Sequence, residues 1–126
     1  MKGTKPALKQ DQAAITAKIT APRWLAKEAR AEWERVMPIL TERRILTDAD
    51  LGGLENYCIC IGRVRETEAL IQAGQEPDMM LKLARLQDKA MASARQLAAE
   101  LGLTPVSRSR PAIREDGDNE PDPLEV

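Results

Sequence analysis

Lysine and arginine side chains concentrate in the first part of the chain, and the chemistry open to them is the neutralisation of phosphate. Residues 1–46 contain ten of them against five Asp and Glu, a surplus of five, although the 126-residue chain has a formal net charge of -1. Such a cluster predicts salt-dependent contacts with the phosphates of duplex DNA. An aromatic content of 2% disfavours recognition of single strands by stacking. The candidate contacts are Lys2, Lys5, Lys9, Lys18, Arg23, Lys27, Arg30, Arg43 and Arg44, with Arg108 and Arg110 as secondary candidates.

These cations also have a plainer interpretation, which the sequence leaves open. The lysines of residues 1–20 equally suit a solvated tail. Arg43 and Arg44 equally suit the carbonyl end of a helix, where positive charge is favourable.

Residue types that catalyse reactions are sparse. The chain contains no His, so neither a Ser-His nor a Cys-His nucleophile pair can form. The Gly-x-x-x-x-Gly-Lys pattern of a phosphate loop is absent from the sequence. Asp116, Asp118 and Glu120 have the spacing of a calcium loop, but Pro121 stands where that loop needs Gly. We therefore expect a protein that is not an enzyme and takes no metal and no cofactor.

The two cysteines, Cys58 and Cys60, are two residues apart in a predicted helix. Their side chains then point to different faces and cannot form a disulfide with each other. Two thiols without further soft ligands do not make a zinc site. The sequence has no apolar run of bilayer length and no apolar signal segment near Met1. These features predict reduced thiols in a cytoplasmic protein.

The strongest helix signal covers Thr47 to Ala73. Thr47 and Asp50 have the spacing of a capping box, and Gly74 suits the residue just past a helix end. A helix of this length spans roughly 40 Å at about 1.5 Å per residue and needs partner helices. Gly52 and Gly53 weaken its first turns and suggest close approach of another backbone. Apolar residues recur at three- and four-residue steps: Leu51, Leu54, Cys58 and Ile61, with Tyr57, Val64 and Ile71 alongside.

Two further helices are predicted, one on each side of this element. The first covers Ala21 to Ile45, and Pro38 predicts a kink or a break in it near Val36. Its apolar face comprises Leu25, Ala29, Trp33, Val36, Met37 and Leu40, with Trp24 beside it. The second covers Asp78 to Leu101, between Pro77 and Gly102. Its stripe comprises Met79 or Met80, Leu83, Leu86, Ala90, Ala94, Leu97 and Leu101, for which core packing is the preferred interpretation.

Short connections between these helices predict an all-α fold, in which a long antiparallel helical hairpin packs with a shorter N-terminal helix. We expect a basic flexible arm at residues 1–20, and a helical core for oligomerisation and DNA binding at residues 21–102. An extended segment with an acidic disordered tail is expected at residues 103–126. A core of about 80 residues is close to the size at which a single core is only marginally stable. Composition therefore supports a self-associating bundle and an ordinary small monomer equally.

The stretch from Glu100 to Arg110 reads as a helix stop, in which Gly102 ends the helix and Pro105 prevents its continuation. It also resembles the end of the core in a family of tailed-phage terminase small subunits, which closes with Leu-Gly-Leu-Thr-Pro-x-x-Arg. The resemblance extends from about Pro22 to Arg110. Further positions that fit the family pattern are Pro22, Leu25, Trp33, Pro38, Leu40, Leu46, Thr47, Asp50, Tyr57, Cys58, Glu68, Ala69 and Gly74.

The resemblance implies a regulatory subunit of a viral genome-packaging motor in the bacterial host cell. Such subunits assemble into homo-oligomeric rings, bind double-stranded viral DNA and modulate a separate large subunit that holds the ATPase and the nuclease. By the same resemblance, Leu124 and Val126 would anchor the tail on the large subunit, with a solubilising tail as the alternative.

Two other functions stay open at this point. A helix-turn-helix transcription regulator would insert the helix that starts at Thr47 into a major groove, although Leu51 and Leu54 occupy the turns where polar side chains are usual. A helical adaptor protein would have no nucleic-acid partner. The solution mass separates these functions, since a ring contains many subunits, a regulator two, and an adaptor one or two.

Overall fold

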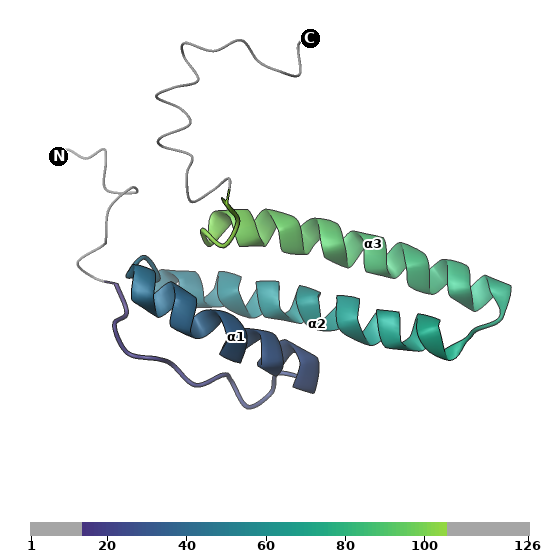
Figure 1. The fold of residues 1–126 in the computed structure, drawn as a ribbon, viewed down its shortest axis with the longest axis horizontal. Helices are drawn as coiled ribbons and strands as arrows, with labels where there is room; N and C mark the ends of the chain where they lie inside the picture. The colour runs from purple at the N-terminus through teal and green to yellow at the C-terminus, as the bar shows by residue number, and fades with distance from the viewer. Residues whose placement is uncertain (1–13, 106–126) are drawn as a thin grey trace, which may run out of the picture.

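The computed structural model describes residues 14–105, which form three α-helices and one short 3-10 helix, with no strand in that range. The helices are α1 (Lys27–Arg43), η2 (Asp48–Asp50), α2 (Leu51–Ala73) and α3 (Pro77–Glu100). The prediction of an all-α fold is confirmed. The long helices α2 and α3 lie side by side and run in opposite directions, while α1 lies against the first half of α2 (Figure 1).

The start of α2 is fixed by the capping box that the sequence predicts. The Asp50 carboxylate accepts a hydrogen bond from the Thr47 amide at 2.9 Å and another from the Thr47 hydroxyl at 3.1 Å. This first turn has 3-10 geometry, so the α-helix itself begins at Leu51. At the other end, Gly74 has a φ of 92° and its amide bonds to the carbonyl of Ile71. The glycine is needed because a side chain disfavours a positive φ.

The ends of α3 also follow local signals. Pro77 is its first residue, where the missing amide costs no helical hydrogen bond. At the C-terminal end Gly102 has a φ of 77° and donates its amide to Ala99, and Leu103 donates its amide to Ala98. This pair of bonds is a Schellman motif, which satisfies the last carbonyls of the helix. Leu103 is partly buried and packs against the core.

The start of α1 differs from the sequence prediction by six residues. The chain is extended through Ala21, turns at Arg23 and Trp24, and becomes helical only at Lys27. The turn closes through a 3.2 Å bond from the Leu25 amide to the Pro22 carbonyl. A proline disfavours helical backbone in the residue before it, which excludes Ala21 from the helix.

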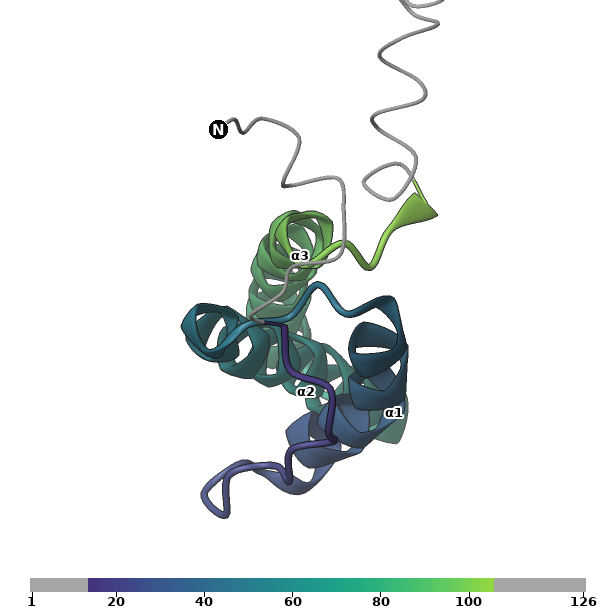
Figure 2. The ribbon, with the colours of Figure 1, turned by 90° about the vertical axis from the view of Figure 1, so that its left-hand side faces the viewer.

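Residues 14–26 run back along α1 in the direction opposite to the helix (Figure 2). The indole of Trp33 donates to the Ile19 carbonyl at 2.8 Å, and the Ile15 amide donates to the Leu46 carbonyl at 2.7 Å. Ile15 and Ile19 also pack against the core. The stretch from residue 14 to residue 20, expected as part of a flexible arm, is therefore held on the helical core.

Pro38 lies inside α1, which continues through it to Arg43, so of the two expected alternatives, a kink or a break, the break does not occur. The missing proline amide leaves the Glu34 carbonyl without its helical partner. Both Pro38 and Glu34 are exposed, so water can satisfy that carbonyl.

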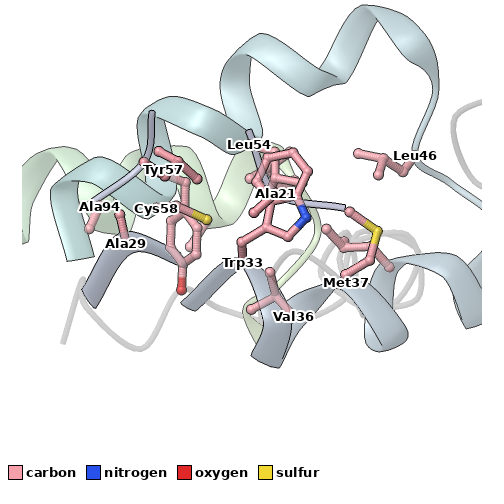
Figure 3. Packing of buried hydrophobic residues seen from close by; sticks show 14 residues of the cluster. Ala21, Ala29, Trp33, Val36, Met37, Leu46, Leu54, Tyr57, Cys58 and Ala94 are labelled. Atoms are coloured by element: carbon pink, nitrogen blue, oxygen red, sulfur yellow. The ribbon is translucent and has the colours of Figure 1, made fainter. Parts of the chain in front are cut away.

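The core lies mainly between α1 and the first half of α2, and part of it is shown in Figure 3. The predicted apolar face of α1 is buried at all six positions. Along α3, by contrast, Leu86 is 48% exposed, so core packing was the wrong interpretation for this position. Of the two alternatives Met79 and Met80, Met79 is 41% exposed and Met80 is half-buried. Alanines fill the corresponding contacts of the second half of α3: Ala90, Ala94 and Ala98.

Gly62 allows α1 and α2 to approach each other closely. A Cβ atom at this position would lie 2.9 Å from the backbone nitrogen of Ala29 and 3.2 Å from its Cα and Cβ atoms. At Gly52 and Gly53 an added Cβ would meet no atom within 4 Å. The expected close backbone approach therefore occurs within this chain at Gly62 and not at Gly52 or Gly53.

We predict that Gly62→Ala destabilises the fold, because the new methyl group must push the α1 backbone away from α2. The expected loss in the free energy of unfolding is about 1–3 kcal/mol, typical of an overpacked contact. Urea unfolding followed by circular dichroism measures it.

Gly53→Ala is the matched control, because it puts the same methyl group into open space on the same helix. Alanine is the better helix former, so this variant should gain up to about 1 kcal/mol. Equal effects of the two substitutions would contradict the close packing at Gly62.

Candidate nucleic-acid interface

Two of the predicted DNA contacts, Arg23 and Lys27, lie at the start of α1 and are exposed. They flank Trp24, whose residue surface is 63% exposed. Arg30 is half-buried and has a structural role, since its guanidinium donates to the carbonyls of Pro22 and Arg23 at 3.0 Å each. Arg30 therefore shapes the turn that presents Arg23 and Trp24.

An open groove of about 320 Å³ adjoins this turn and lies between the start of α1 and the middle of α2. Its apolar surface comes from Trp24, Leu25 and Ile59, and Gly62 contributes no side chain to fill it. Arg63 and Glu66 are its charged members and both are exposed. We call this feature the Trp24 groove.

Arg63 is a cation of this region that the sequence analysis did not select. Arg63 directly follows Gly62 in α2. Nothing in the sequence indicates that this face of α2 lies near the turn at Arg23 and Trp24. Together Arg23, Lys27 and Arg63 give three exposed cations next to the Trp24 groove.

Arg43 and Arg44 lie at the opposite end of α1, roughly 25 Å away for a helix of 17 residues. The Arg43 guanidinium donates to the Gly102 carbonyl, so it joins the end of α1 to the end of α3. Arg44 is exposed and adopts a left-handed conformation with a φ of 57°, and its amide caps the carbonyls of Leu40 and Thr41. These two arginines thus contribute to helix ends, and they are not part of one patch with Arg23 and Lys27.

Lys18 is exposed on the extended segment that runs along α1. The other predicted residues lie outside the described range of 14–105, so the structure does not place them. These are Lys2, Lys5, Lys9, Arg108 and Arg110 among the DNA contacts, and Leu124 and Val126 for docking on a large subunit.

A buried carboxylate, Glu32, forms the strongest electrostatic cluster among residues 14–105. Its side chain is 1% exposed, and it accepts two hydrogen bonds from Arg35 at 2.9 and 2.6 Å. From α2, Arg65 donates at 2.6 Å and the Tyr57 hydroxyl donates at 2.6 Å. Both oxygens of the carboxylate are therefore satisfied, and half of their donors come from the other helix.

Burial alone would raise the pKa of Glu32, but the hydrogen bonds from Arg35 and Tyr57 and the charges of Arg35 and Arg65 outweigh it. The net effect holds the pKa of Glu32 below its ordinary value of 4.5. Burial, and then the hydrogen bond to Glu32, raises the pKa of Tyr57 above its usual range. Glu32 thus stays ionised and Tyr57 stays protonated at neutral pH, which suits a structural role.

The described residues offer little other chemistry. Both cysteines are free, and burial together with the Glu32 charge raises the pKa of the Cys58 thiol to about 12. Within residues 14–105, no three His, Cys, Asp or Glu side chains gather into a group that could hold a metal ion. In that range no helix combines the length and the apolarity that crossing a bilayer requires.

Comparison with known families gives one assignment for most of the chain. The family model described as phage terminase, small subunit, matches residues 29–118, which are 90 of the 126 residues. Neither the curated proteins nor the solved structures give a match. The matched region includes α1 from Ala29 on, all of α2 and α3, and the Leu101 to Arg108 motif that carries the resemblance.

We predict that Glu32→Gln lowers the free energy of unfolding by about 1–3 kcal/mol at neutral pH, because charge-assisted hydrogen bonds between α1 and α2 are lost. The pKa of Glu32 is depressed in the folded chain. Its contribution is therefore present above its ordinary pKa of 4.5 and is lost as pH falls through the folded value. The difference in the free energy of unfolding between parent and variant should therefore become smaller as the pH is lowered. Urea unfolding curves recorded at progressively lower pH measure this difference.

Glu34→Gln serves as the control, since Glu34 is an exposed acid on the same helix. Its unfolding free energy should stay within about 0.5 kcal/mol of the parent. A gap for Glu32→Gln that stays constant down to strongly acidic pH would show that the carboxylate charge contributes nothing.

Proposed function

The chain belongs to the family of phage terminase small subunits, and from this membership we propose that it binds viral duplex DNA and regulates the large subunit during genome packaging. The observation that carries the proposal is the family match over residues 29–118. In this role the chain is not an enzyme, because the large subunit supplies ATP hydrolysis and DNA cleavage. It works in the cytoplasm of the bacterial host, where the viral DNA is packaged.

For the DNA contact, we propose the exposed cations at the start of α1 together with the lysines that precede them. Within the described residues, Arg23, Lys27 and Arg63 form the proposed phosphate-binding surface. Lys18, on the segment before α1, is a fourth exposed cation of this surface. Phosphate contacts of this kind neutralise charge and do not read base sequence. We propose Lys2, Lys5 and Lys9, which precede these residues in the sequence, as further contacts, and Arg108 and Arg110 as secondary contacts.

For the assembly, we propose a homo-oligomeric ring in which the hairpin of α2 and α3 supplies subunit contacts. The second half of α2 and the first half of α3 lie beyond the reach of α1 (Figure 1). Large apolar side chains are exposed mainly there, which supports burial against another copy: Leu70 at 50%, Met79 at 41%, Leu81 at 52% and Leu86 at 48%. Met91, 40% exposed, lies just beyond them in the second half of α3. In a ring each weak DNA contact would be repeated, so the contacts would add by multivalency.

For regulation, we propose that the acidic tail docks on the large subunit, with Leu124 and Val126 as its apolar anchors. Short apolar anchors in a polar segment can bind a groove while the remaining residues stay solvated.

The DNA contact predicts a steep loss of duplex affinity with added salt. Replacing Arg23 and Lys27 together by Ala should reduce the slope of log K against log salt by about 2, since each phosphate contact contributes about 0.9. Fluorescence anisotropy with a labelled duplex over a range of salt concentrations measures the slope.

Lys82→Ala combined with Lys89→Ala is the matched control, because it removes the same charge from exposed positions on α3. Its slope should equal that of the parent. If both double variants flatten the slope equally, the start of α1 is not the phosphate contact.

The ring predicts a solution mass that is many times the 14.0 kDa of one chain, measured by light scattering after gel filtration. Leu86→Glu should shift the mass to smaller species, because it puts a charge into the apolar contact. Ala92→Glu, which adds the same charge at another exposed position of α3, should leave the mass unchanged. A folded parent that runs as a monomer at all concentrations would contradict the ring.

The tail proposal predicts that a chain ending at Arg114 captures less large subunit than the full chain does in a pull-down. The truncated chain keeps every described residue, so its helices should form as in the full chain. Undiminished capture would leave the tail with a solubilising role only.

A further inference from the structure

The Trp24 groove has an exposed apolar surface and a basic surround, and these two properties define what can occupy it. Trp24 is 63% exposed, although an indole of this size is normally well buried. Arg63 and Glu66 are the charged residues that line the groove. Two further exposed cations, Arg23 and Lys27, adjoin the lining residues Trp24 and Ala26 in the sequence, so the exposed charges of this region have a surplus of two positive. An occupant should therefore combine apolar side chains with negative charge.

The C-terminal segment of the same chain has this composition. Residues 115–126 contain six Asp and Glu and no Lys or Arg, and they end with Leu124, Glu125 and Val126. Two apolar side chains, Leu124 and Val126, thus adjoin an acidic stretch. The two charge patterns are complementary, as at interfaces where opposite potentials meet.

The chain length allows the segment to reach the groove. The end of α3 lies at the C-terminal end of α1, because Arg43 donates to the Gly102 carbonyl there. The groove lies at the other end of α1, roughly 25 Å away along a helix of 17 residues. The nine residues 106–114 span up to about 30 Å when extended, so residue 115 can arrive beside the groove.

We propose that residues 115–126 dock on the Trp24 groove of their own chain, with Leu124 and Val126 against Trp24 and Ile59 and with the tail carboxylates facing Arg23, Lys27 and Arg63. In this position the tail covers cations that contact DNA, so it competes with DNA for the same surface. The docking is independent of the proposed function, and only the competition rests on it. Release of the tail, for example to the large subunit, then uncovers the DNA contact.

The docking can be tested in the full chain, because its two tryptophans report separately. Trp33 is 2% exposed and its indole donates a hydrogen bond to the Ile19 carbonyl, whereas Trp24 lines the groove. Fluorine NMR of fluorotryptophan-labelled protein gives one signal for each. The double variant Leu124→Ser, Val126→Ser should move the Trp24 signal and leave the Trp33 signal in place, and adding a synthetic peptide of residues 111–126 should move the Trp24 signal back.

Gly117→Ser combined with Asn119→Ser is the control within the same tail, and it should move neither signal. The proposal is overturned if the Leu124 and Val126 variant leaves the Trp24 signal unchanged. It is equally overturned if both tryptophan signals move together, since that result indicates a change of the whole fold.

Competition between the tail and duplex DNA is tested separately, by measuring the affinity for duplex DNA. A tethered segment acts at a millimolar effective concentration, so releasing it should raise the affinity for duplex DNA by about tenfold in the Leu124 and Val126 variant. The control variant should bind DNA like the parent. Equal affinities of all three proteins would overturn the competition, whereas absence of DNA binding in all three would contradict the proposed function and leave the NMR result on docking intact.

Discussion

The attachment of α1 to α2 depends on one buried carboxylate, Glu32, and on the donors that surround it. Removing a carboxylate from water is costly unless strong hydrogen bonds replace the lost solvation. Here Arg35 supplies two such bonds from the same helix, and Tyr57 and Arg65 supply one each from α2. Since Tyr57 and Arg65 on α2 both bond to Glu32 on α1, sliding one helix along the other would break these two bonds, and the cluster therefore helps to fix the register between the helices.

Close packing and the carboxylate cluster act together at this contact. Gly62 lies between Tyr57 and Arg65 in the sequence of α2, and its missing side chain lets the Ala29 backbone approach. A wider separation of the helices would lengthen the bonds to Glu32, so the small residue and the buried charge require each other. The same missing side chain leaves the space that becomes the Trp24 groove.

Because α1 packs against only the first half of α2, the two halves of α2 differ in how many helices cover them. The first half of α2 has α1 on one side and α3 on another, whereas its second half has only α3 (Figure 1). A pair of helices cannot bury apolar side chains all round, and Leu70, Leu81 and Leu86 are accordingly about half exposed. The cations also have two different roles. Arg30 and Arg43 donate hydrogen bonds to backbone carbonyls, while Arg23 and Lys27 are exposed to solvent.

The sequence by itself determined the helical class and most helix ends, because these depend on contacts within a few residues. Thr47 with Asp50, Pro77 and Gly102 each set a local backbone conformation, and the structure has all three as expected. Only the tertiary structure decided that Glu32 is buried, that Gly62 is a packing site, and that Arg63 and Trp24 line the same groove. From sequence alone, a charged residue on a helix is expected to be exposed. Burial of Glu32 depends on hydrogen-bond donors from a second helix, which the sequence does not reveal. The late start of α1 has the same cause, since hydrogen bonds from Trp33 and Arg30 to carbonyls of the preceding segment hold that segment outside the helix.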